Sequence, residues 1–191
     1  MVLRVRAGDK TTINQWKSAS SPRPKKARQV KSNVKTMLIC CFDIKGLVHF
    51  EFISQGQTVN ELFYLEVLKR LHDAVRRKRP ELWWSGECLL HQDSAPAHTA
   101  LSVCQFLTKN GMTTALHPSY SPYLAPCDFF LFPRMKRDLK GKRFQNVEEV
   151  REKTAEALKA ITLQEFQNCF EQWKKWWDKC IDCQGEYCEG D

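Results

Sequence analysis

The sequence predicts one α/β domain, built as a mixed sheet flanked by helices and preceded by a basic arm. Short apolar runs of strand length alternate with longer segments in which apolar residues recur every three or four positions. A hairpin signal joins the first two runs, and each later run is followed by a helical segment. With 191 residues, 42% of them hydrophobic, the chain is long enough for one domain with a sizeable core.

The N-terminal third supplies the strand signals. Residues 1–7 alternate weakly between apolar and basic side chains, which is typical of a short strand. Residues 34–42 form an apolar run that predicts a buried strand. Residues 43–46 predict a hairpin turn, and residues 47–53 return as the partner strand.

Helices and short strands are expected to alternate in the middle of the chain. Residues 60–79 have a helical spacing of leucines and a basic end, and Pro80 is expected to stop this helix. A short strand at 87–91, a helix at 99–110 and a strand at 113–116 follow.

Three further helices are expected to complete the domain. One is expected to begin at Asp128 and end near residue 139. The other two are predicted at about 147–160 and 163–179.

The net charge of +8 is concentrated at the N-terminus. Residues 1–35 contain ten Lys and Arg and one acid, a charge of +9, whereas the remainder sums to −1. We therefore divide the chain into a basic arm at 1–33 and a domain at 34–191. Such an arm most readily meets a polyanion, with nucleic acid as the first candidate; a solvated tail is the alternative.

Composition also argues against several classes of protein. No apolar run approaches the roughly 20 residues of a membrane helix, and the N-terminus is too short and charged for a signal peptide. We therefore expect an intracellular protein without membrane association. Most of the nine cysteines lie in apolar runs and are expected to be reduced thiols. Cys180, Cys183 and Cys188 form a partial zinc signal without a fourth ligand.

Two acids stand out because each lies at a junction between elements. Asp93 follows an apolar strand, and Asp128 begins a helix; thirty-four residues separate them. Carboxylates at the rim of a sheet are accessible to a cation and a phosphate. The alternative is structural, with a turn residue at Asp93 and a helix N-cap at Asp128.

The motifs around these acids closely resemble the catalytic core of mariner-family transposases in the Tc1/mariner superfamily. They are Asp93-Ser94-Ala95-Pro96-Ala97-His98 and Tyr120-Ser121-Pro122-Tyr123-Leu124-Ala125-Pro126-Cys127-Asp128. Further matches, such as Arg77-Lys78-Arg79-Pro80 and Gly141-Lys142-Arg143-Phe144, extend the resemblance over about residues 14–190. The same module forms the transposase half of a SET-domain/mariner fusion methyltransferase. The chain is therefore expected to be an N-terminally truncated member.

The resemblance implies an RNase H-like fold whose first strand is missing here or replaced by residues 1–7. It also implies a site in which three acids bind two Mg²⁺ or Mn²⁺ ions for DNA cleavage and strand transfer. Asp93 matches the family's second acid and Asp128 its third, so both are candidate catalytic residues and metal ligands. The first acid belongs to a Gly-Asp-Glu run; the nearest match, Asp9, lies too close to Trp16 for the family spacing.

Because the first acid of the family has no match at the right spacing, the sequence predicts a transposase domain with a degenerate cleavage site. One alternative is a still-active metal-dependent endonuclease in which Asp43 or Asp9 completes the site. The other is a non-enzymatic, domesticated module that binds DNA or chromatin or dimerises.

Phosphate contacts with DNA are expected from basic side chains in two regions. The candidates are Arg23, Lys25, Lys26 and Arg28 in the arm and Arg134, Lys136, Arg137, Lys140, Lys142 and Arg143 beyond Asp128. The resemblance further implies a nuclear protein that forms a homodimer or pairs with an intact transposase.

Overall fold

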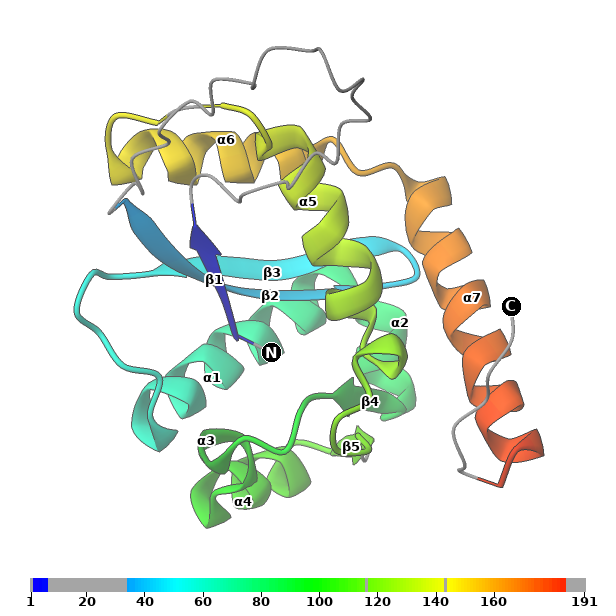
Figure 1. Ribbon diagram of the computed structural model, residues 1–191. Helices are drawn as coiled ribbons and strands as arrows, with labels where there is room; N and C mark the ends of the chain where they lie inside the picture. The colour runs from blue at the N-terminus through cyan, green and yellow to red at the C-terminus, as the bar shows by residue number, and fades with distance from the viewer. Residues whose placement is uncertain (1, 7–33, 116, 143, 185–191) are drawn as a thin grey trace, which may run out of the picture.

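The computed structural model describes residues 2–6, 34–115, 117–142 and 144–184 (Figure 1). Its strands pair as two sheets, an antiparallel one of three strands and a parallel one of two. They are β1 (Val2–Arg6), β2 (Lys35–Asp43) and β3 (Gly46–Ile53) in the first sheet, and β4 (Cys88–His91) and β5 (Met112–Ala115) in the second. The predicted α/β class is confirmed, with the strands divided between two sheets.

Residues 2–6 were assigned by sequence to the basic arm, yet they pair with the domain. β1 runs antiparallel to β2, with Val2 opposite Ile39 and Arg6 opposite Lys35. The short strand expected there is confirmed. The rest of the arm lies outside the described residues.

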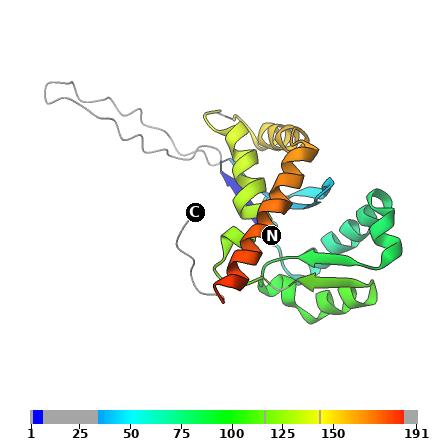
Figure 2. The same cartoon turned by 90° about the vertical axis from the view of Figure 1, so that its right-hand side faces the viewer.

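Helices surround the sheets on several sides (Figures 1 and 2). The longer ones are α1 (Glu61–Lys78), α4 (Leu101–Lys109), α5 (Phe132–Leu139), α6 (Val147–Lys159) and α7 (Leu163–Asp182). The shorter ones are α2 (Pro80–Ser85), α3 (Pro96–Thr99), the 3₁₀ turn η1 (Pro122–Leu124) and the π-helical turn η2 (Cys127–Leu131). In Figure 1, α6 lies on one side of the antiparallel sheet and α1 on the other.

The alternation along β2 divides the core between these two sides. Leu38 and Cys40 belong to a cluster with α5, α6 and the start of α7, in which Leu131 and Leu158 are fully buried. Ile39 packs with Val67 of α1 on the opposite side. A third cluster joins α1 to α4 and the parallel sheet. The period-two pattern of β2 therefore places helices on both of its faces.

Local chemistry explains where the observed helices depart from prediction. Pro80 ends α1 as expected, but it also starts α2, because a helix tolerates proline at its first position. The helix expected at 99–110 begins earlier and is divided at Ala100, whose backbone is extended (ψ 145°).

The structural alternative for Asp128, an N-cap, is wrong. The chain enters η2 at Pro126, and no side chain there forms a capping hydrogen bond. Asp128 lies within the first turn of η2, which continues into α5. Its carboxylate is therefore not used to cap the helix. Single π-helical turns within helices are frequent at functional sites.

The cysteine expectation is partly wrong. Seven described cysteines are free thiols. Cys183 is instead disulfide-bonded, so its sulfur is not available as the thiolate that a zinc site requires. None of the described helices is long and apolar enough to span a membrane.

Candidate active site

The parallel pairing of β4 and β5 brings two polar side chains to one edge of that sheet. His91 and Ala115 are register partners at the carboxyl ends of the two strands. Asp93 follows His91 by two residues, and His117 follows Ala115 by two. Since parallel strands end at the same edge, both side chains emerge there. The strand-end position predicted for Asp93 is confirmed.

A hydrogen bond from a buried histidine fixes the Asp93 carboxylate. Oδ1 of Asp93 lies 2.5 Å from Nδ1 of His98 and accepts a second hydrogen bond of 3.2 Å from the backbone N–H of Ala95. Because α3 begins at Pro96, His98 lies within its single turn and faces back toward Asp93. One oxygen of Asp93 is held in this way, while its side chain remains 39% exposed.

His98 is itself held by a buried polar network. Its ring is 2% exposed and stacks on Tyr64 at a centroid distance of 4.1 Å. The Tyr64 hydroxyl donates to Oε1 of Gln92 at 2.6 Å, and Nε2 of Gln92 donates to the carbonyl of His98 at 3.2 Å. These bonds satisfy polar groups that would be costly to bury alone. Helix α1 thus positions Asp93 through Tyr64, Gln92 and His98.

These contacts determine the ionisation of Asp93. The hydrogen bond from His98 lowers the pKa of Asp93 to about 2, assisted by the Ala95 N–H and opposed by burial. At neutral pH the group is therefore a carboxylate, and Nδ1 of His98 carries the proton that it donates.

Asp128 has the opposite shift. Burial raises the pKa of Asp128, the charge of Asp93 raises it further, and His117 and Lys136 oppose both effects. Within the described part of the chain its carboxylate accepts no hydrogen bond, although its backbone N–H donates to the Ala125 carbonyl at 2.8 Å. Two neighbouring carboxylates thus differ in environment: Asp93 is anchored and Asp128 has free oxygens.

Both carboxylates line one open cavity of about 380 Å³. His117 and the turn from Ser119 to Pro122 line the same cavity. The predicted pair, separated by thirty-four residues, is brought together at this surface. The charge of Asp93 adds to the effect of burial on the pKa of Asp128.

No third carboxylate, histidine or cysteine joins Asp93 and Asp128 in a metal-binding group among the described residues. The hypothesis that Asp43 completes the site is therefore wrong. Arg79 donates to both carboxylate oxygens of Asp43, at 2.6 and 2.9 Å, and the backbone N–H of Lys45 donates to Oδ1 at 2.9 Å. Asp43 thus holds the β2–β3 turn against the end of α1. Asp9 lies outside the described residues.

The basic residues predicted to contact DNA fall into three groups. Lys136, Arg137, Lys140 and Lys142 are exposed. Arg134 is only 15% exposed and donates to Glu165 at 2.5 Å and to Asp138 at 2.7 Å, so its charge is neutralised within the fold. The remaining candidates, Arg23, Lys25, Lys26, Arg28 and Arg143, lie outside the described residues.

Sequence reasoning assigned no role to the residues that support the acids: Tyr64, Gln92, His98 and His117. His98 belongs to the motif that begins at Asp93. Its position five residues after Asp93, with Pro96 between them, was the signal that could have indicated a contact between the two side chains. Nothing in the sequence indicated that Tyr64, twenty-eight residues before Gln92, would be its partner.

Comparison with known proteins agrees with this architecture. The family described as "Transposase (partial DDE domain)" matches residues 8–85. The mariner Mos1 transposase of Drosophila mauritiana is 32% identical over 169 residues, which cover 88% of this chain and 49% of that protein. The human histone-lysine N-methyltransferase SETMAR is 29% identical over 154 residues, which cover 80% of this chain and 22% of that protein.

Solved structures of Mos1 are similar in fold. The catalytic domain of Mos1 transposase is 33% identical, with a TM-score of 0.75 over 81% of this chain and 76% of that one. The Mos1 paired-end complex with Mn is 29% identical, with a TM-score of 0.85 over 98% of this chain and 55% of that one. This chain therefore spans about half the length of the full-length Mos1 relatives that it matches.

Proposed function

Because this chain belongs to the mariner family of transposases, with the RNase H-like fold of the Mos1 catalytic domain, we propose that it acts on DNA through a degenerate divalent-metal site at Asp93 and Asp128. The observation that carries the proposal is the convergence of these two carboxylates on one open cavity. The proposed substrate is a DNA phosphodiester, and the proposed cation is Mg²⁺ or Mn²⁺.

The residues at the cavity fit such a cation. Carboxylate oxygens are the ligands that hard divalent ions prefer. Asp93 is ionised and oriented by His98, and Asp128 has free oxygens beside it. Burial raises the pKa of Asp128, and the charge of Asp93 adds to this effect; a cation held by the two carboxylates would offset both. Bound ions of this kind activate an attacking water or 3′-hydroxyl and stabilise the leaving oxygen.

We propose that cleavage is weak, because two acids hold one ion loosely and leave a second ion without its main ligand. One solved Mos1 paired-end complex is a complex with Mn, which supports the choice of cation. A homodimer, or a dimer with an intact transposase, and a nuclear location are part of the same proposal. Light scattering that gave only the monomer mass of 22.3 kDa, with and without DNA, would count against self-association. Imaging of a tagged chain tests its location.

The proposal is tested by calorimetric titration of Mn²⁺ into the wild-type chain and into a variant carrying Asp93→Asn and Asp128→Asn. We expect saturable binding in the wild type and none in the double variant, because both carboxylates are lost. Asp73→Asn, which removes an exposed carboxylate of α1, is the matched control and should bind as the wild type does. A wild-type chain without saturable binding would overturn the proposed metal site.

The pH dependence of Mn²⁺ affinity provides a second prediction. The pKa of Asp128 is raised, so the proton on this carboxylate competes with the cation over a higher pH range than for an ordinary Asp. Affinity should therefore rise with pH over a higher range than it would for a site made of ordinary Asp carboxylates. Asp128→Asn should abolish most of this dependence, whereas a profile unchanged by that substitution would show that another group titrates.

A second candidate function is a fully active metal-dependent endonuclease. The observation that favours it is that the family match begins at Gly8, immediately before Asp9. A plasmid-nicking assay in Mn²⁺ separates the two candidates. Strong nicking that is lost in Asp9→Asn supports the active enzyme; weak nicking that is unaffected by Asp9→Asn supports the degenerate site. DNA binding without any nicking supports the non-enzymatic alternative.

A further inference from the structure

Two strand edges in the fold have no strand beside them in the described part of the chain. β1 pairs with β2 only from Lys35 to Ile39, although β2 continues to Asp43. β4 pairs with β5 on one edge and with no described strand on the other. Such edges present rows of backbone N–H and C=O groups that can pair with a further strand.

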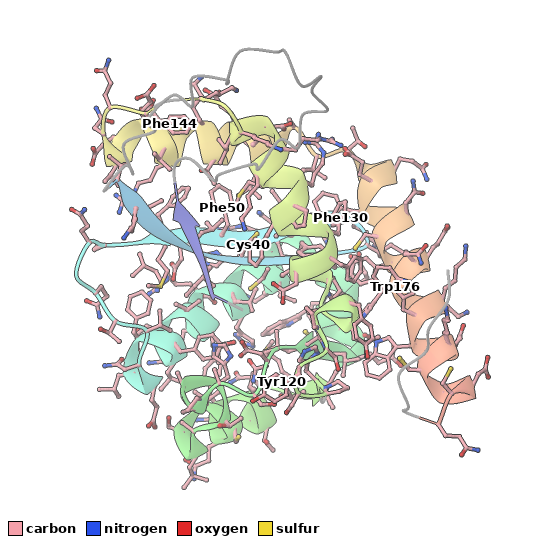
Figure 3. The ribbon with its side chains drawn as sticks, viewed as in Figure 1. Cys40, Phe50, Tyr120, Phe130, Phe144 and Trp176 are labelled. Atoms are coloured by element: carbon pink, nitrogen blue, oxygen red, sulfur yellow. The ribbon has the colours of Figure 1, made fainter. Side chains whose placement is uncertain are left out.

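Both edges border one cavity of about 280 Å³, which we call the strand slot. Its lining includes the consecutive residues 39–43 of β2 and 89–93 of β4 and the turn after it. A cavity over one face of a strand would meet every second residue, because successive side chains point to opposite faces. The consecutive residues therefore indicate that the slot lies alongside both strands. Cys40, labelled in Figure 3, lies on the part of β2 that borders it.

The lining of the strand slot is mainly apolar. The lining residues of α1 are Tyr64, Val67, Leu68 and Leu71, and those of α7 are Phe170 and Trp173. Its two acids, Asp43 and Asp93, are already paired with Arg79 and His98. Leu89 of β4 nevertheless has an exposed fraction of 62%, whereas strands of parallel pairs are usually buried on both faces. The cover of β4 is therefore incomplete.

The two edges and the apolar lining define the occupant of the slot. Pairing with both edges requires an extended backbone, and contact with α1 and α7 favours apolar side chains on both of its faces. The two long segments outside the described residues do not supply such a strand. Residues 7–33 and 185–191 contain no run of four apolar residues.

We propose that the strand slot binds an extended apolar segment of a partner polypeptide, which pairs with β2 at Cys40–Asp43 and with the free edge of β4. The bound strand continues the line of β1 beyond Val2 and joins the two sheets into one. Its main-chain hydrogen bonds supply affinity, and the limited volume of the slot favours small side chains such as Val and Ala. The inference requires neither DNA nor a metal ion, so it stands apart from the proposed function.

The probe is a fluorescein-labelled peptide of alternating Val and Ala with a Lys at each end, titrated into the full chain without DNA or divalent ions. A matched peptide carries N-methyl groups on its central residues, which keep the side chains but remove backbone donors. Leu89→Glu places a charge at the slot. Leu101→Glu is the control, because Leu101 is 73% exposed and does not line the slot. Since both leucines are exposed, neither change should impair folding.

We expect saturable binding of the unmethylated peptide by fluorescence anisotropy, with slower amide hydrogen exchange in both β4 and Cys40–Asp43. The methylated peptide should bind about tenfold more weakly or worse, because its hydrogen bonds are lost. Leu89→Glu should weaken binding by a similar factor, about tenfold, because a charge must be desolvated, whereas Leu101→Glu should bind as the wild type does. The inference is overturned if no saturable binding occurs or if the two leucine variants bind equally. Equal affinity for the two peptides would also overturn it, since the contact would then be apolar without strand pairing.

Discussion

A His98→Ala substitution is expected to lower the free energy of unfolding by about 2–4 kcal/mol. The imidazole is almost fully buried, stacks on Tyr64 and donates to Asp93, so its removal leaves a cavity and unpaired polar groups. The pKa of Asp93 should rise toward its ordinary value, because the hydrogen bond from His98 is the largest cause of its depression. Urea unfolding and carboxyl NMR titration measure the two effects.

The lowered pKa of Asp93 also predicts how the stability of the fold changes with pH. A carboxylate with a lowered folded pKa stabilises the fold above its unfolded pKa, near 3.9, and loses that contribution as pH falls toward about 2. In His98→Ala, this loss of stability at acid pH should be smaller. It should also weaken Mn²⁺ binding by about tenfold or more, since residues that orient a ligand affect metal affinity.

His98→Asn is the informative control, because an Asn side-chain amide can replace the Nδ1–H donor while the stacked ring is lost. We expect it to retain most of the Asp93 pKa shift and Mn²⁺ affinity and to recover only part of the stability. If both variants left the Asp93 pKa unchanged, the positioning role of His98 would be wrong.

Arg134→Met should destabilise the chain by about 1–3 kcal/mol yet leave its DNA affinity nearly unchanged. Arg134 joins α5 to α7 through Glu165 and also pairs with Asp138, and methionine preserves only the apolar stem. Lys136→Met should lower DNA affinity and leave stability nearly unchanged, because Lys136 is exposed and makes no ion pair among the described residues. Urea unfolding and DNA binding over a range of salt concentrations distinguish the two.

For Lys136→Met, the slope of log affinity against log salt should decrease in magnitude by about one, which corresponds to the loss of one phosphate contact. A drop in slope for Arg134→Met without loss of stability would show that its ion pairs open and that the sequence-based assignment of Arg134 to DNA was right.

The strands and long helices of this protein could be predicted from its sequence because local signals agree with the final fold. The apolar run at 34–42, the hairpin turn after it and the capped helix at 61–78 each carry their own pattern. The π-helical turn at Asp128 and the break at Ala100 could not be predicted, since no local pattern distinguishes them from a regular helix.

The sequence by itself determined which acids are the candidates: Asp93 and Asp128 stand in recognisable motifs, and their types suit a hard cation. Only the tertiary structure decided where they lie and what holds them. It brought them to one cavity, held Asp93 through Tyr64, Gln92 and His98, committed Asp43 to Arg79, and neutralised Arg134. The physical reason is that burial and ion pairing depend on partners twenty-eight to thirty-six residues apart, whose distances are set by packing.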